Sequence, residues 1–170
     1  GELYFEYHRG TYTSMARNKR GNRKTELGLM DLELLSVLAE PQLPYPAEAL
    51  DSLWKNTLLN QFHDILPGSS IARVYTEANE AHRQLQRDAQ RHTASACHAL
   101  LNDGEGITFF NSLGFEREEI VELPKAFARG AVTPEGEHIA VCGAQARVCI
   151  PAMGAVTLMP SSYGEAAPTV

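Results

Sequence analysis

Apolar side chains recur three and four positions apart through most of the first hundred residues, and breakers divide this pattern into three segments. Such a spacing is typical of helices that bury one face. We expect helices over residues 15–39, 46–65 and 71–101, with prolines between the first two and a Pro-Gly step before the third. The predicted apolar stripes are Leu27, Leu34, Leu35 and Leu38 in the first helix, Leu50, Leu53, Trp54, Leu58 and Ile65 in the second, and Ile71, Val74, Ala78, Ala81, Leu85, Ala89, His92, Ala96 and Ala99 in the third.

The ends of these segments carry residues that stabilise helix termini. A Thr or Ser at positions 13–14 and a Ser at positions 69–70 are predicted to cap the first and third helices, because a hydroxyl oxygen accepts from a free backbone amide. Ahead of the first helix, alternating apolar and polar residues over 2–8 predict a short extended strand. The short connections predict three helices that pack antiparallel.

Beyond residue 102 the pattern changes to short alternating runs separated by Gly, Pro and Asn, which is typical of β-strands in an antiparallel sandwich. The sequence therefore predicts an α+β chain, an antiparallel three-helix bundle followed by a partial antiparallel β-sandwich region. We expect a helical domain over residues 1–102, the start of a β domain over 103–160 and a linker or tail over 161–170. The predicted strands are 107–110, 119–123, 139–141, 146–150 and 155–158.

Composition narrows the classes of function. The formal net charge is −6, which argues against binding to nucleic acid or to anionic membranes. No apolar run is long enough to cross a membrane. Three scattered cysteines form neither a disulfide framework nor a metal-binding spacing, which favours a reducing compartment and a cytoplasmic location. The sequence leaves the oligomeric state open.

One cluster of charge runs against this acidic balance. Arg17, Arg20 and Lys24 share one face of the first predicted helix. A nucleic-acid or phosphate site is one interpretation of this face. A solvated face, or one that pairs with acidic neighbours, is the favoured interpretation, because charge runs on helices usually face water.

The stretch with the most chemistry is residues 60–70, which read Asn-Gln-Phe-His-Asp-Ile-Leu-Pro-Gly-Ser-Ser. His63 and Asp64 are predicted in the last turn of the second helix, where a carboxylate faces the negative end of the helix dipole. A local rule that is broken without compensation is typical of functional sites. A neutral imidazole is a metal ligand, and a carboxylate beside it can bind a metal or accept from hydroxyl groups. On spacing alone, a buried, hydrogen-bonded His beside a partly exposed Asp is the favoured alternative.

The residues of this stretch, with a Phe before the His, are accompanied by several further motifs along residues 1–125. Together they resemble glycoside hydrolase family 38, the α-mannosidases, and are similar to its bacterial and cytosolic-type branch. The resemblance is weaker after residue 125. The supporting positions are 8–14, 22–23, 26, 34–35, 53–55 and 111–117.

The resemblance implies a fragment of an exo-acting, retaining α-mannosidase that uses one divalent cation, usually Zn²⁺. His63 matches a metal-ligating His of the family, and Asp64 matches an Asp that binds hydroxyl groups of the mannose. The remaining metal ligands, the nucleophile and the acid/base belong to an N-terminal α/β domain that this sequence lacks, so no catalytic residue is assigned. The implied partners are a mannoside, that missing domain and the rest of the β domain, and the chain alone is expected to be inactive.

Two other interpretations come from the residues alone. One is a noncatalytic helical-bundle interaction module with an attached β domain. The other is a small metal-dependent hydrolase that is complete in itself, which is disfavoured because no further cluster of His, Asp or Glu supports His63 and Asp64. Within the family, the sequence leaves the natural substrate and the identity of the metal open.

Overall fold

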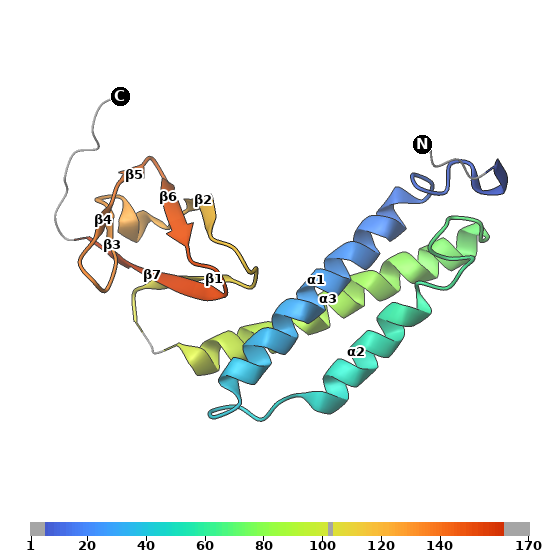
Figure 1. The fold of residues 1–170 in the computed structure, drawn as a ribbon, viewed down its shortest axis with the longest axis horizontal. Helices are drawn as coiled ribbons and strands as arrows, with labels where there is room; N and C mark the ends of the chain where they lie inside the picture. The colour runs from blue at the N-terminus through green and yellow to red at the C-terminus, as the bar shows by residue number, and fades with distance from the viewer. Residues whose placement is uncertain (1–5, 102–103, 162–170) are drawn as a thin grey trace. The chain divides into compact units, whose positions relative to one another are not determined.

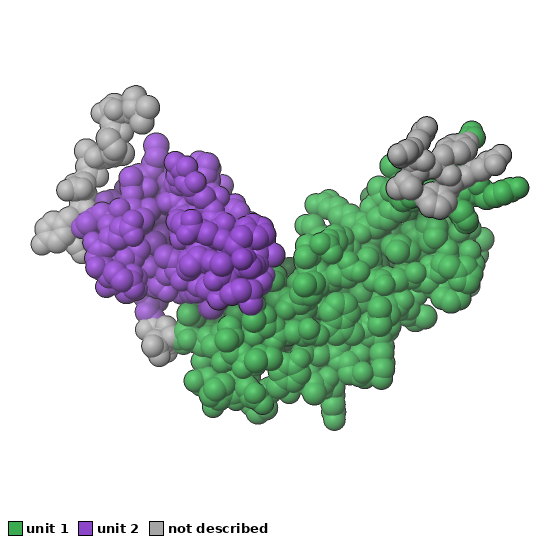
Figure 2. Space-filling model, in the orientation of Figure 1, with its two compact units in different colours: residues 1–102 green, residues 103–170 purple. Residues whose placement is uncertain are grey.

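The computed structural model describes residues 6–101 and 104–161 and divides into two compact units, residues 1–102 and 103–170. Figure 1 traces the chain, and Figure 2 colours the two units separately. Positions 2–5 of the predicted strand and positions 162–170 of the predicted tail lie outside the described residues. Within the described part of the chain, no helix has the length and apolar character needed to cross a membrane.

The first unit is an up-down-up bundle of three helices, α1 (Ala16–Ala39), α2 (Ala47–Leu59) and α3 (Ala72–Leu100). α2 runs against both of its neighbours, and α1 packs mainly along α3 (Figure 1). Pro46 stands at the N-cap of α2, where its fixed backbone suits the start of a helix. The predicted antiparallel three-helix bundle is therefore confirmed.

The apolar core of the bundle involves the second half of α1. Leu29 and Leu32 are 0% exposed, whereas Leu27 and Leu38 of the predicted stripe are 42% and 52% exposed. The prediction that Leu27 and Leu38 lie on the packed face of α1 was therefore wrong. Leucines occur on several faces of this helix, and only one face packs against the other helices. The core cluster comprises Leu29, Leu32, Leu50, Leu53, Leu85 and Ala89, with Trp54 packed against it.

The stripes predicted for α2 and α3 are confirmed near the middle of each helix and fail near the connection between them. Leu85 and Ala89 are buried, whereas Leu58 and Ile71 are 57% and 69% exposed. Leu58 lies in the last turn of α2, and Ile71 precedes α3. Apolar side chains therefore gather on the surface at this end of the bundle.

The first half of α1 has a buried face that is polar. Asn18, Asn22 and Thr25 continue the line of the buried leucines and are at most 8% exposed. His82 of α3 lies against them, is 2% exposed and has its Nδ1 atom 3.3 Å from Thr25 Oγ1. A Cβ atom at Gly21 would lie 3.0 Å from carbon atoms of the His82 ring. The close approach of α1 and α3 here therefore depends on a residue without a side chain.

The helix starts differ from the sequence prediction. Met15 precedes α1 in a left-handed conformation with φ of 51°, and neither it nor Ile71, which precedes α3, makes a side-chain capping hydrogen bond. The predicted capping hydroxyl of Ser14 instead donates to Pro67 O at 2.7 Å. Glu6–His8 form a 3₁₀ helix rather than part of a strand. A strand needs a partner, and the described residues of this unit contain no other strand.

The second unit contains the strands β1 (Ile107–Asn111), β2 (Arg117–Glu122), β3 (Ala131–Val132), β4 (His138–Ile139), β5 (Val141–Cys142), β6 (Gln145–Ile150) and β7 (Gly154–Pro160). One antiparallel sheet has the order β1-β7-β3-β4, and the other has the order β2-β6-β5. Four predicted strands match β1, β2, β6 and β7. The strand predicted over 139–141 is divided between β4 and β5, and β3 was not predicted, because two residues are too few to show an alternating pattern.

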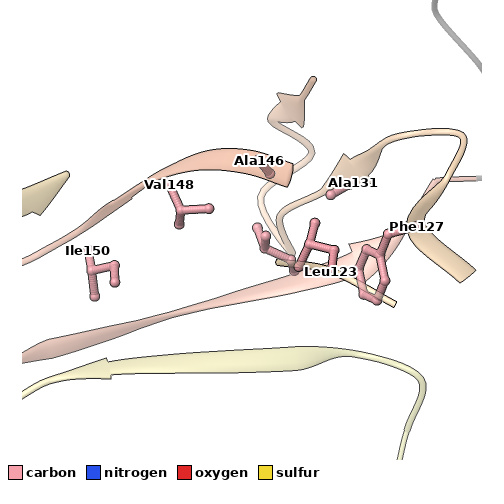
Figure 3. Packing of buried hydrophobic residues seen from close by; sticks show 7 residues of the cluster. Leu123, Phe127, Ala131, Ala146, Val148 and Ile150 are labelled. Atoms are coloured by element: carbon pink, nitrogen blue, oxygen red, sulfur yellow. The ribbon is translucent and has the colours of Figure 1, made fainter. Parts of the chain in front are cut away.

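The core of the second unit is built on the alternation along β6. Ala146, Val148 and Ile150 are buried, and the residues between them are exposed, as expected of a strand with one face on the core. Figure 3 shows these side chains gathered with Leu123 and Phe127, which is 1% exposed. The second unit therefore has a core of its own.

The buried imidazole of His82 makes the stability of the bundle depend on pH. Burial lowers the pKa of His82, because the charged form loses its hydration. The folded pKa lies below the unfolded value of about 6.5, so the unfolded chain takes up the proton first as the pH falls. We expect the melting temperature to be highest above about pH 7 and to fall with acidification below about pH 6.5.

Replacing His82 by Gln removes this ionisation and should flatten the acid side of the profile. Thermal melts followed by circular dichroism between about pH 5 and about pH 8 measure the effect. An equally steep profile in the wild-type chain and in His82→Gln would contradict the assignment.

Candidate functional site

The connection between α2 and α3, residues 60–71, carries the predicted functional motif and is called the 60–71 segment. α2 ends at Leu59, so His63 and Asp64 lie in a run of turns beyond the helix and not in its last turn. Backbone amides at positions 60–62 bond to carbonyls three positions back, which tightens and ends the helix. The helix-dipole argument therefore does not apply to Asp64, and the contacts that hold the turns decide its position.

Lys19 of α1 is the main tether of the 60–71 segment. Its Nζ atom donates to Leu66 O at 2.9 Å, to Pro67 O at 3.3 Å and to Ser14 O at 2.5 Å. Three carbonyl oxygens thus match the three N–H groups of the ammonium, whose hydrogen bonds are strengthened by its charge. Burial lowers the pKa of Lys19. One cation on α1 therefore ties Leu66 and Pro67 of the 60–71 segment to Ser14, just before α1.

Two amide side chains add to this tether. Asn18 Nδ2 donates to Ile65 O at 3.4 Å, and Gln61 Nε2 donates to Asn22 Oδ1 at 3.0 Å and to Glu26 Oε1 at 2.7 Å. The bonded residues lie 35 to 47 positions apart in the sequence. Sequence reasoning did not find them, because no local pattern links such distant positions.

The exit of the 60–71 segment is fixed by a glycine and a tyrosine. Gly68 has φ of +99°, and a Cβ atom there would overlap Ser14 Oγ, so this turn requires glycine. Tyr75, which is 4% exposed, donates its hydroxyl proton to Asp64 O at 3.1 Å and accepts from Ser70 N at 2.9 Å. Tyr75 of α3 thus holds the backbone of Asp64, the residue predicted to bind the sugar.

The side chains of His63 and Asp64 are exposed and close together. Their exposed fractions are 74% and 59%, and His63 Nε2 lies 3.3 Å from Asp64 Oδ2. The His63 and Phe62 rings lie with centroids 4.2 Å apart, and the Ser69 hydroxyl donates to Asp64 Oδ1 at 3.4 Å. The buried His of the alternative interpretation is therefore wrong, since the imidazole stands on an open surface.

His63 and Asp64 alone do not complete a metal-binding site. Across residues 6–101 and 104–161, no group of three or more His, Cys, Asp or Glu side chains could hold an ion. Zinc sites in proteins use three or four protein ligands. The pair offers one nitrogen donor and carboxylate oxygens on an accessible face, which fits one side of a coordination shell that other residues would complete.

Large exposed apolar side chains occur in the 60–71 segment and next to it. Leu59, Phe62 and Ile71 are 65%, 56% and 69% exposed, and Tyr12 and Met15 near the start of α1 are 69% and 45% exposed. Ser14 bonds to the 60–71 segment, so this start of α1 lies at the same end of the bundle. Exposed apolar residues gathered in this way are typical of a surface that another protein surface covers.

Comparisons with known proteins identify the family of this chain. The family described as the α-mannosidase middle domain matches residues 6–100. α-Mannosidase 2C1 of Homo sapiens is 41% identical over 167 residues, which cover 94% of this chain and 15% of the human protein. An α-mannosidase of Saccharomyces cerevisiae is 53% identical over 79 residues, which cover 44% of this chain and 7% of the yeast protein. A glycosyl hydrolase family 38 protein from Enterococcus faecalis aligns over 94% of this chain and 26% of its own, with 16% identity and a TM-score of 0.71.

The chain therefore belongs to the α-mannosidase family, and its fold is that of a glycosyl hydrolase family 38 protein. Residues 6–100 match their middle domain, which confirms the resemblance carried by the motifs. The chain spans about 15% of the length of the human relative that it matches. The family match also replaces the interpretation as an unrelated interaction module.

Removing the Lys19 tether should loosen the 60–71 segment and lower stability. Lys19→Met keeps the helix-forming character of the position but removes hydrogen bonds to three carbonyl groups, of which Pro67 O keeps the Ser14 hydroxyl as a donor. We expect a loss of about 1–2 kcal/mol in the free energy of unfolding. Lys55→Met is the matched control, because Lys55 is exposed and pairs with Asp51 on its own helix. Its effect should stay within about 0.5 kcal/mol. Urea unfolding measures both variants, and equal losses would contradict the tether.

Proposed function

We propose that this chain serves, within a longer protein, as the part of an exo-acting, retaining α-mannosidase that completes the binding of one divalent cation and of the terminal mannose. The observation that carries the proposal is the exposed pair of His63 and Asp64 on a segment held by α1 and α3. Solvent-exposed side chains on a fixed backbone are pre-organised to meet a ligand, which lowers the entropy lost on binding. The family membership supplies the substrate class.

In this proposal His63 contributes one imidazole nitrogen to the cation, for which Zn²⁺ is the expected ion. Asp64 accepts hydrogen bonds from hydroxyl groups of the sugar, and the hydroxyl of Ser69 helps to orient its carboxylate. The bound cation would supply positive charge that holds sugar hydroxyls during the reaction. Phe62 packs its ring near the imidazole and restricts its motion.

The remaining groups come from outside this chain. A retaining glycosidase uses a carboxylate nucleophile and a second carboxyl group as acid and base, and neither is assigned here. The exposed apolar residues Leu59, Phe62 and Ile71 are the surface against which we place the missing α/β domain, because covering them removes apolar area from water. That domain would bring the other metal ligands to His63.

The cysteines support a cytoplasmic location for this protein. Cys97, Cys142 and Cys149 are free, and Cys142 and Cys149 are exposed. Exposed free thiols persist in reducing compartments and are oxidised in secretory ones.

The purified chain should be inactive towards an aryl α-mannoside and should not retain Zn²⁺ after dialysis, because it provides one side of a coordination shell. Phenol release and metal content measure the two properties, and circular dichroism verifies that the helices are formed. The longer protein that contains this chain is the positive control. Turnover by the purified chain would show that its own residues suffice and would overturn the proposal.

In the longer protein, His63→Ala should lose bound metal together with activity, by at least about a hundredfold in turnover. His98→Ala is the matched control, since His98 is an exposed residue near the end of α3. Elemental analysis and the aryl α-mannoside assay follow both variants. Unchanged metal content in His63→Ala would remove His63 from the coordination shell.

A further inference from the structure

A second feature of the bundle lies away from the 60–71 segment, in the groove between α1 and α3. A hollow of about 350 Å³ is lined by Arg17, Arg20, Lys24, Arg83 and Gln86. No carboxylate lines it, although the whole chain carries a net charge of −6. The local charge of this groove is therefore opposite to that of the chain.

The α1 side of the hollow is a row of three like charges. Arg17, Arg20 and Lys24 follow one another at spacings of three and four, which places them on one face, where like charges repel. Among the described residues none of the three forms an ion pair. Nearby Arg23, by contrast, pairs with Glu26 at 3.4 Å. Arg17, Arg20 and Lys24 are all exposed, so the solvated face of the favoured sequence interpretation is confirmed, whereas pairing with acidic neighbours is not observed for these three.

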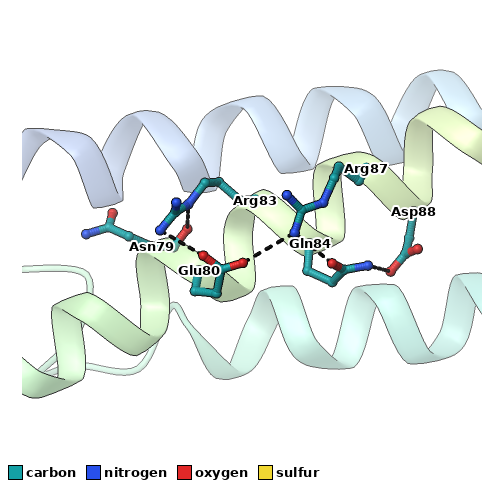
Figure 4. A network of polar contacts seen from close by, with 6 residues as sticks. All are labelled: Asn79, Glu80, Arg83, Gln84, Arg87 and Asp88. Carbon is teal, nitrogen blue, oxygen red and sulfur yellow. Dashed lines mark hydrogen bonds and ion pairs between the residues drawn. The ribbon is translucent and has the colours of Figure 1, made fainter.

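On the α3 side of the hollow, the guanidinium group of Arg83 is held in a defined position. Figure 4 shows Glu80 between Arg83 and Arg87. Arg83 Nη2 lies 2.8 Å from Glu80 Oε2, and Arg83 Nε donates to Asn79 O at 3.2 Å. The carboxylate of Glu80 is shared with Arg87 at 3.3 Å. Glu80, which does not line the hollow, thus positions Arg83, and Arg83 is the guanidinium that the α3 side contributes beside the three cations of α1.

A fixed polar side chain lines the hollow between these walls. Gln86 Nε2 donates to Gly21 O at 3.1 Å and to Thr25 Oγ1 at 3.3 Å, which joins α3 to α1. Gln86 and Lys24 also line an adjoining hollow of about 520 Å³ along the same groove. An anionic group held by the arginines therefore has neighbouring room for the organic part of a molecule.

We propose that this groove binds the phosphate group of a small molecule, either inorganic phosphate or a phosphate monoester. The planar guanidinium groups of the three lining arginines match phosphate oxygens in geometry and charge, and Lys24 adds an ammonium as a fourth donor centre. An anion placed here relieves the repulsion along α1. The site uses none of the residues that hold the 60–71 segment, so it stands independently of the proposed metal site.

Calorimetric titration of the chain with inorganic phosphate tests the proposal at constant ionic strength, because salt screens exposed charges. We expect saturable binding of one phosphate per chain. Arg20→Gln and Arg17→Gln should each weaken it by about tenfold, as expected for the loss of a charged hydrogen bond. Arg23→Gln removes the same charge from the same helix but does not line the hollow, and it should leave the affinity within about twofold.

Glycerol 3-phosphate distinguishes the two sources of the phosphate group. Tighter binding than that of inorganic phosphate assigns the groove to a monoester, and equal or weaker binding assigns it to the free anion. Both results support a phosphate site. The proposal is overturned if neither compound saturates, or if Arg23→Gln weakens binding as much as Arg17→Gln and Arg20→Gln do. Circular dichroism of each variant confirms that the helices are intact.

Discussion

The position of His63, in the turns between α2 and α3, depends on the ammonium group of Lys19 on α1. Lys19 binds carbonyl oxygens just before α1 and at the end of the 60–71 segment, where no helix or sheet satisfies the backbone. Buried or half-buried carbonyls need donors, and the ammonium supplies three at one point. Asn18 and Tyr75 act in the same way on neighbouring stretches. The surface that carries His63 and Asp64 is therefore built from turns whose backbone is held by side chains of α1 and α3.

The buried residues of the bundle form an apolar half and a polar half. Leu29 and Leu32 belong to the apolar core, which provides most of the driving force for folding. Asn18, Asn22 and His82 occupy the polar half. Asn18 Oδ1 and His82 Nε2 are buried there without a hydrogen-bond partner among the described residues, which costs stability. Polar residues in place of apolar ones weaken a core, and functional regions are where such departures are typical. In this chain they lie beside the segment that carries His63 and Asp64.

The sequence was sufficient for the helices, the fold class and the family, and insufficient for the detail of the site. Periodicity located the three helices because each spans several turns. It misjudged Leu27 and Leu38, since α1 has leucines on more than one face. It placed His63 inside a helix because the apolar pattern continues to Ile65, whereas the hydrogen bonds change at Leu59. The contacts of Lys19 with Leu66 and Pro67 could not be predicted from the sequence, because they join residues 47 and 48 positions apart.

The polar half of the bundle also bears on how the chain moves. Regions with few buried apolar contacts open at lower free energy than the body of a domain, so amide hydrogens around Asn22 and His82 should exchange before those around Leu29 and Leu32. Local opening would then begin between the polar faces of α1 and α3, while the leucine-rich half of the bundle stays closed. Such a difference in local stability would let the bundle adjust to a neighbouring domain without global unfolding.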